Sequence, residues 1–250
     1  MTDATVSPAD LETLKYRLDA YESLLQSFKA AGYTFSLFDS DDQLESGEIL
    51  LRHDVDLSVD RALAMAECEH RLGVQSTYCV LLNAPAYDIV DPRTVRILQR
   101  ISKLGHEIAL HFDTHVYWKP TAEPHPHSVA SKVEQELTVL TRVVGEEISS
   151  VSFHIPPQWV LGRSYDGFVN TYAPRFFEEI AYLSDSSQKW TTTPPFPNGL
   201  AETFQLLVHP GLWHDEHRPM AKIVRERCQR THRAVDHYFD PLKLEEDRLR

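Results

Sequence analysis

The sequence predicts an α/β protein, a distorted (β/α) barrel of about seven parallel strands that forms a single domain with an N-terminal helix packed on it. Short apolar stretches alternate with amphipathic stretches of helical period, which is the element order of a parallel sheet with helical crossovers. Several of the apolar stretches end in Asp or His, as barrel strands do at a functional face. A length of 250 residues is ordinary for one such domain.

The composition is that of a folded globular protein. Hydrophobic residues make up 42% of the chain and charged residues 25%, and no apolar run approaches the ~20 residues of a membrane span. The formal net charge of -12 argues against nucleic acid or an anionic membrane surface as the main partner, because both attract clustered Lys and Arg. The N-terminus carries no basic region and no apolar run, so we expect no secretory signal and a cytoplasmic location.

Residues 1–47 are expected to form the N-terminal helix and a lead-in to the barrel. Ser7 followed by Pro8 is typical of a helix start, with the serine as N-cap and the proline at the first helical position. Apolar residues then recur at helical spacing until Gly32, where we expect the helix to end. The alternation that follows predicts a short strand through Tyr33, Phe35 and Leu37.

Residues 48–215 are expected to form the catalytic core, followed by a C-terminal helix within residues 216–250. Apolar stretches that are bounded by turn residues predict the strands of this core. They lie over residues 48–56, 74–82, 148–155, 181–185 and 204–209, and one more ends at His111.

The residues between these strands predict helices. Ser58 is a candidate N-cap, and Gly73 follows the last apolar position of the helix that it opens. Asp91 followed by Pro92 predicts the start of the next helix. Apolar residues at helical spacing predict two more helices, over residues 128–144 and 219–238.

A histidine pair at one strand end is the first sign of a functional site. The stretch G-H-E-I-A-L-H-F-D-T-H places His111 at the end of an apolar strand and His115 just beyond it. Neutral imidazole is the commonest protein ligand for a divalent metal, and two side chains at this spacing can turn toward one point. By itself, the spacing is more typical of surface or core histidines than of a metal site.

Other predicted strand ends supply the remaining parts of a hydrolytic site. Two histidines and one carboxylate around an open position are the ligands of a catalytic zinc ion, while a second carboxylate can act as base and another histidine as acid. For Asp56 the alternative is a helix cap shared with Ser58. For His209 the alternative is a turn that begins at Pro210. The candidates are Arg52, Asp54, Asp56, His111, His115, His154, Asp185 and His209.

These residues carry a resemblance to the polysaccharide deacetylase family, of carbohydrate esterase type, in the branch whose first motif reads R-H-D-V-D. The resemblance spans residues 49–213 of this chain. The second motif of the family is similar to the histidine stretch and implies that His111 and His115 bind the metal. The first motif implies a base and a metal ligand, which we place on Asp54 and Asp56. Because Val55 separates the two aspartates, the reverse assignment stays open.

The remaining motifs of the family imply which residues act as general acid, orient that acid and hold the base. L-L-V-H is similar to the fifth motif and implies that His209 is the general acid, while Y-L-S-D is similar to the fourth and implies that Asp185 orients it. The third motif of the family has an Arg that holds the base, where this chain has His154. Imidazole cannot reproduce a permanently charged guanidinium fork. Arg52 lies two residues before Asp54, on the same strand face, so we expect it to hold the base instead.

The resemblance implies a metal-dependent amide hydrolase that removes an acyl group, in the simplest case acetyl, from an N-acylated amino sugar or glycoconjugate precursor of surface-polysaccharide synthesis. The expected cofactor is a divalent metal ion, Zn2+ first and Ni2+, Co2+ or Mn2+ as alternatives. One rival function is a deformylase or another small-molecule C–N hydrolase of the same superfamily. The other is a catalytically silent sugar-binding protein on this barrel. The expected partner is a small molecule or glycan with an N-acyl group, and the sequence leaves the oligomeric state open.

Overall fold

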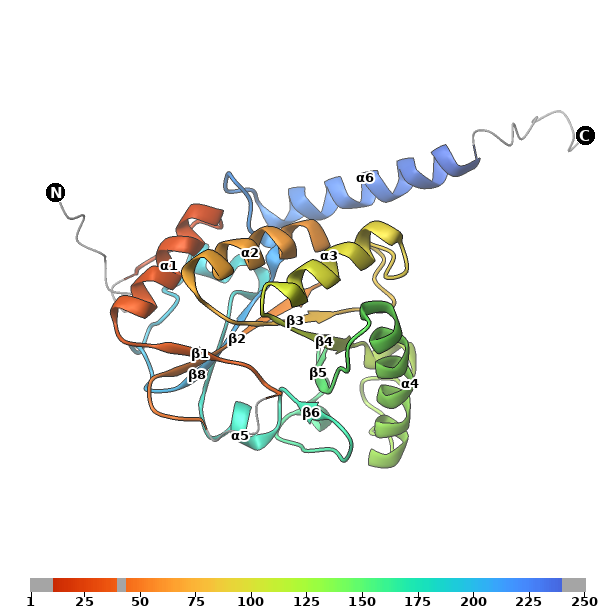
Figure 1. Cartoon of the computed structure of the whole chain (residues 1–250), viewed down its shortest axis with the longest axis horizontal. Helices are drawn as coiled ribbons and strands as arrows, with labels where there is room; N and C mark the ends of the chain where they lie inside the picture. Colours follow the sequence, from red (N-terminus) through yellow and green to blue (C-terminus); the bar gives the residue numbers. More distant parts are fainter. Residues whose placement is uncertain (1–10, 40–43, 240–250) are drawn as a thin grey trace, which may run out of the picture.

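A curved parallel sheet runs through the centre of the protein, and helices pack around it (Figure 1). The computed structural model describes residues 11–39 and 44–239. The strands pair in the order β6-β5-β4-β3-β2-β8-β7, and β1 pairs with the first residues of β2. Their bounds are β1 Thr34–Ser36, β2 Glu48–Val55, β3 Thr77–Val80, β4 Glu107–Phe112, β5 Ser150–Phe153, β6 Val169–Asn170, β7 Ala181–Ser184 and β8 Phe204–Val208.

All of these pairings are parallel, so the strands end at one edge of the sheet. Within the described ranges β6 and β7 end the path without pairing with each other. The sheet is therefore a curled half barrel rather than a closed one. The expected distorted barrel of about seven parallel strands is confirmed, with seven strands in the path and β1 beside β2.

The two faces of β2 show how the sheet separates the helical layer from the barrel interior. Residues 49–55 of this strand are all buried, and successive side chains point to opposite faces. His53 faces the helices, where its Nε2 lies 2.8 Å from Glu69 Oε1. Arg52 and Asp54 face the interior. The alternation therefore puts the charged residues of β2 inside the half barrel.

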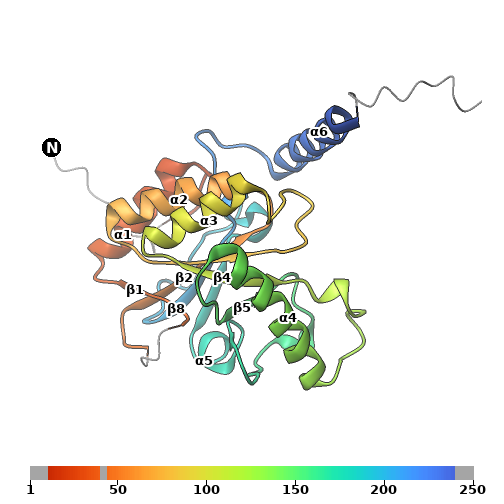
Figure 2. The same ribbon diagram turned by 45° about the vertical axis from the view of Figure 1, so that its right-hand side comes forward.

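Three helices lie side by side over one face of the sheet in both views, α1, α2 and α3 (Figures 1 and 2). Ser58 caps α2 by accepting a hydrogen bond from the Arg61 backbone N–H at 3.3 Å, and Gly73 closes this helix with a left-handed φ of 64°. Asp91 caps α3. These predicted helix ends are confirmed. The helices are α1 Leu18–Ala30, α2 Val59–Leu72, α3 Pro92–Lys103, α4 Pro126–Val144, α5 Pro174–Phe177 and α6 Met220–Phe239.

The N-terminal helix starts later than the sequence predicts. The expected start at Ser7 and Pro8 lies outside the described residues, and residues 11–17 are not helical although their apolar spacing continues that of α1. The backbone N–H of Leu14 donates instead to the Trp190 carbonyl at 2.7 Å, and the Tyr16 carbonyl accepts from the His214 backbone N–H at 3.4 Å. Hydrogen bonds to distant loops thus replace the helical ones over this segment.

Two elements near the open edge of the half barrel were not predicted, β6 and α5. They are only two and four residues long, too short for a periodic signal. The C-terminal helix is confirmed as α6, which runs outward from the body in Figures 1 and 2 with Ile223 as its buried residue. None of the helices in the described part of the chain combines the length and the apolarity needed to cross a membrane.

Candidate functional site

One cavity of about 420 Å³ lies at the carboxyl ends of the strands. Asp54 and Asp56 reach it from the end of β2, His111 from β4, His154 from the end of β5 and His209 from the end of β8. Because the strands are parallel, the ends that carry these residues meet at one mouth. The predicted gathering of the polar strand ends is confirmed for these five residues.

Arg52 holds Asp54 with a guanidinium fork. Its Nε donates to Oδ1 at 2.9 Å and its Nη2 donates to Oδ2 at 2.7 Å. Three further side chains fix the arginine, which has no solvent exposure: Tyr172 OH at 2.7 Å, Gln205 Oε1 at 2.9 Å and Thr171 Oγ1 at 3.1 Å. The predicted contact between Arg52 and Asp54 is therefore confirmed as a bidentate pair.

The environment of Asp54 keeps its carboxylate charged. Burial by itself raises the pKa of this carboxyl, but the Arg52 guanidinium and the nearby His111 outweigh burial and lower the pKa to about 2. Ser152 also donates a hydrogen bond to Oδ1, at 3.2 Å. Asp54 is thus ionised at neutral pH and oriented, as a general base must be.

Asp56 faces two imidazoles across a short gap. Its Oδ1 lies 3.4 Å from His111 Nε2 and 3.4 Å from His154 Nδ1, and these two nitrogens are 3.2 Å apart. Ligand atoms of the three residues all lie within 4.8 Å of one another. Within the described part of the chain Oδ1 is buried and has no hydrogen-bond partner. A divalent cation would satisfy such an oxygen, so the three residues fit a metal site.

The charges around Asp56 keep its carboxylate ionised. Burial raises the pKa of this carboxyl, yet the imidazoles of His111, His154 and His209 hold it well below its ordinary value. The pKa of His154 is raised in turn by its contact with Asp56, against the opposing effect of burial. An anionic carboxylate between imidazoles is the oxygen and nitrogen donor set of hydrolytic metal sites.

Ser152 connects the proposed base to the metal group, and the sequence analysis did not single it out. Its Oγ donates to Asp54 and therefore accepts from Nδ1–H of His111, 2.5 Å away. This contact leaves Nε2 of His111 free to face Asp56, which is how partners of ligand histidines set the ring. The available signal was that Ser152 lies two residues before His154 on one strand face.

The structure does not bring His115 into the metal group. His115 lies in a single turn of 3-10 helix, Thr114–Val116, that Asp113 caps by accepting the His115 backbone N–H at 2.9 Å. The same carboxylate holds the imidazole, with His115 Nδ1 3.0 Å from Asp113 Oδ1. His154 takes the third place instead, although the sequence analysis placed it among the catalytic residues rather than among the ligands.

His209 and Asp185 form a pair on the other side of Asp56. Nδ1 of His209 lies 2.6 Å from Asp185 Oδ1, and Asp185 is fully buried and also accepts from Trp213 Nε1 at 2.8 Å. Burial lowers the pKa of His209, but Asp185 outweighs it and raises the pKa to about 9. His209 Nε2 remains directed at the site, 3.9 Å from Asp56 Oδ2. The predicted contact between Asp185 and His209 is confirmed.

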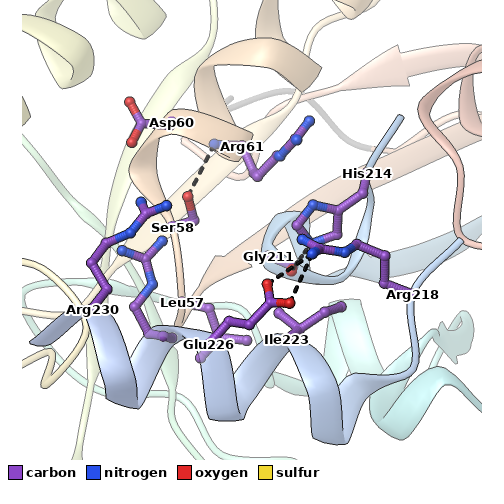
Figure 3. Close-up of a pocket in the computed structure, with 11 residues that line it drawn as sticks. Leu57, Ser58, Asp60, Arg61, Gly211, His214, Arg218, Ile223, Glu226 and Arg230 are labelled. Atoms are coloured by element: carbon purple, nitrogen blue, oxygen red, sulfur yellow. Dashed lines mark hydrogen bonds and ion pairs between the residues drawn. The ribbon is translucent and has the colours of Figure 1, made fainter. Parts of the chain in front are cut away.

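A second cavity, of about 330 Å³, lies between the start of α2 and the start of α6 (Figure 3). Its arginines are partly neutralised, because Arg218 pairs with Glu226 at 2.8 Å and Arg61 with Asp215 at 3.2 Å. Figure 3 shows the first of these pairs in the middle of the cavity. Among the described residues, the cavity shares no lining residue with the strand-end cavity and holds no group of metal ligands.

Comparison with known proteins gives matches among solved structures alone. No protein-family model matches the chain, and no curated protein sequence matches it. The solved structures that resemble this chain include carbohydrate esterases of family 4. The deacetylase PplD of Streptococcus pyogenes, in complex with acetate, has a TM-score of 0.46 at 13% identity, over 80% of this chain and 84% of that one.

Two further similar structures are an esterase and a pseudoenzyme. A family 4 acetyl xylan esterase from Clostridium thermocellum, in complex with a cobalt ion, has a TM-score of 0.43 at 16% identity, over 65% of this chain and 73% of that one. A family 4 pseudoenzyme from Bacillus anthracis has a TM-score of 0.43 at 10% identity, over 74% of this chain and 60% of that one. These likenesses assign no role to any residue of this chain.

Proposed function

We propose that this protein is a metal-dependent hydrolase that removes an acyl group from an N-acylated amine. One observation carries the proposal. A single cavity holds a carboxylate clamped by Arg52, a group of one carboxylate and two imidazoles, and an imidazole supported by a buried carboxylate. These are the base, the metal ligands and the acid that amide hydrolysis requires.

Asp56, His111 and His154 would hold the metal. When bound, a divalent cation supplies a Lewis acid that polarises the acyl carbonyl and acidifies water. Zn2+ fits a site of two imidazoles and one carboxylate, and Ni2+, Co2+ and Mn2+ accept the same donor types.

The two remaining groups divide the proton transfers. Asp54, ionised and fixed by Arg52, accepts a proton from the attacking water. His209, whose pKa is raised to about 9, is protonated at neutral pH and donates a proton from Nε2 to the departing amine. Asp185 stabilises the imidazolium and holds its ring in place. The oxygen of water ends in the carboxylic acid, and the amine leaves with the proton from His209.

For the substrate we propose an N-acylated amino sugar or glycoconjugate precursor, free, nucleotide-linked or lipid-linked, used in the cytoplasm during surface-polysaccharide synthesis. The motif resemblance supports this choice. The second candidate is a non-sugar amide, such as a formamide, and the replacement of the third-motif Arg by His154 favours it. The net charge of -12 supports the expectation that nucleic acid is not the partner.

The test is hydrolysis by protein of defined metal content. Purified protein is stripped with a chelator, reloaded separately with Zn2+, Ni2+, Co2+ or Mn2+, and incubated with N-acetyl and N-formyl amino sugars and with simple amides. Release of acetate or formate by a loaded form, and not by the stripped form, supports the proposal. Asp54→Asn is the matched control, because it should bind the metal and lose at least about 100-fold in activity. If the stripped protein takes up none of these metals, the result favours the alternative of a catalytically silent sugar-binding protein.

A further inference from the structure

The cavity that holds the proposed catalytic groups is apolar over the rest of its wall. Two of its other polar groups are already engaged, because Tyr172 OH accepts from Arg52 at 2.7 Å and Ser184 Oγ accepts from Lys189 Nζ at 3.0 Å. A group with many hydroxyls would find few partners on this wall. The apolar and aromatic lining residues are Phe153, Ile155, Pro156, Leu161, Tyr172, Phe177, Tyr182 and Leu207.

The aromatic part of this wall lies at the open side of the half barrel. Phe177 and Tyr182 contact each other edge to face with ring centroids 5.0 Å apart, and Tyr172 adjoins both. Phe177, Tyr182 and Leu161 are only partly buried although they line the cavity. Part of their apolar surface is therefore available to a ligand.

Ile155 gives a second, independent sign of an apolar ligand. It follows His154 directly, has a φ of +44°, and is 69% exposed while lining the cavity. A left-handed conformation is unfavourable for a β-branched residue, and such strain is found where the surrounding structure needs a particular placement. Packing within the protein does not explain this side chain, because most of it is exposed. A ligand in the cavity mouth would cover it.

The positions of the two flanking histidines show which part of the substrate meets this wall. His209 Nε2 lies 3.9 Å from Oδ2 of Asp56, whereas His154 Nδ1 lies 3.4 Å from Oδ1, so the two rings approach different carboxylate oxygens. The amine leaves next to its proton donor His209. The acyl group therefore extends away from His209, toward His154 and the adjacent Ile155, in the cavity that Leu161 also lines.

We infer that the preferred substrate is an N-acyl amine whose acyl group is an apolar chain longer than acetyl, bound against Ile155, Leu161 and Phe177. This inference rests on the proposed hydrolase function and names the acyl group that the function acts on. The reaction is unchanged: the oxygen of water bonds to the acyl carbon, the C–N bond breaks, and the products are a fatty or other apolar carboxylic acid and the free amine.

The test compares N-acetyl-, N-butanoyl- and N-hexanoylglucosamine with metal-loaded protein, and measures the released amine with an amine-reactive dye. We expect kcat/KM to rise about fourfold for each methylene that enters the cavity. Ile155→Asn and Leu161→Asn should flatten this rise, and asparagine is chosen because it tolerates the left-handed conformation at position 155. Val90→Asn is the matched control, since Val90 is 60% exposed and does not line the cavity.

A second measurement separates this inference from the proposed function. Calorimetry measures binding of the acetyl and hexanoyl compounds to metal-loaded Asp54→Asn, which is expected to hold the substrate without hydrolysing it. If the variant binds the hexanoyl compound more tightly and the native protein hydrolyses neither compound, the apolar site is supported and the proposed hydrolase function is overturned. If the native protein hydrolyses both compounds and its kcat/KM for the acetyl compound is equal or higher, the inference is overturned and the proposed hydrolase function is retained.

Discussion

Arg52 and Asp54 lie two residues apart on β2 and are joined by two hydrogen bonds, Nε to Oδ1 at 2.9 Å and Nη2 to Oδ2 at 2.7 Å. Both residues are almost entirely buried. The fork holds one orientation of the carboxylate and keeps its pKa low against the effect of burial. One strand thus carries both the proposed base and the cation that orients it.

Arg52→Met should move the acid limb of the pH profile of kcat/KM to higher pH. Without the guanidinium, burial raises the pKa of Asp54 from about 2 back toward its ordinary value of 3.8. A base is inactive when protonated, so activity is lost at a higher pH as the solution is acidified. The measurement is kcat/KM from about pH 3 to pH 7, a range that includes the ordinary Asp pKa of about 3.9.

Arg52→Lys serves as the companion variant, because it keeps a charge but not the fork and is less prone to unfold than Arg52→Met. It should shift the acid limb less. An acid limb that stays in place in both variants would show that Arg52 does not control the base.

Asp185→Asn should move the alkaline limb of the same profile to lower pH. Burial lowers the pKa of His209, and Asp185 is the largest of the effects that raise it to about 9, ahead of Asp56 and Asp54, so neutralising Asp185 should lower this pKa. A general acid is lost as pH rises through its pKa, so activity at pH 8 should fall by on the order of tenfold. Trp213→Phe is the control, because it removes a hydrogen bond to Asp185 and leaves the charge. Equal effects of both substitutions would contradict the assigned role.

His154→Ala should weaken metal binding by at least about 100-fold, whereas His115→Ala should change it by less than about threefold. The reason is that His154 Nδ1 faces Asp56 and His111, whereas Asp113 holds His115. Affinity is measured by competition with a chromogenic chelator at fixed pH. The opposite pattern would assign the metal to His111 and His115, the pair that the family resemblance implies.

Glu107→Gln should remove one part of the pH dependence of stability. Burial and the nearby Asp39 raise the pKa of Glu107 from 4.5 to about 7. Between these values the unfolded chain releases the proton while the folded protein keeps it, so the native protein loses stability as pH rises from 4.5 to 7.

The loss attributable to Glu107 is on the order of 3 kcal/mol. Urea unfolding at pH 5 and pH 8 measures it, as the difference in pH dependence between Glu107→Gln and the native protein. The exposed Glu134→Gln is the control and should leave the pH dependence unchanged. A native-like pH dependence in Glu107→Gln would show that this buried carboxyl is ionised in the folded state.

Interactions between residues close in the sequence made much of the fold predictable. Ser58 and Asp91 cap their helices through backbone N–H groups at most three residues away, and Gly73 closes α2 with its own left-handed conformation. The contact between Arg52 and Asp54 belongs to the same class, because the two-residue period of a strand places both on one face. Such features need no knowledge of distant parts of the chain.

Hydrogen bonds to distant segments explain the features that the sequence did not predict. Residues 11–17 continue the apolar spacing of α1, but their backbone bonds to Trp190 and His214 make them non-helical. His154 enters the metal group because β5 pairs with β4 in a register that sets Ser152 opposite His111. No local pattern specifies that register.

The sequence by itself determined a distorted barrel of about seven parallel strands and the residues at its strand ends, because periodicity, helix caps and strand alternation depend on neighbours along the chain. The tertiary structure decided which of those residues meet. It placed His154 beside Asp56 and His111 and set an apolar wall around the site. The physical reason is that these contacts depend on strand register and loop paths, which long-range packing fixes.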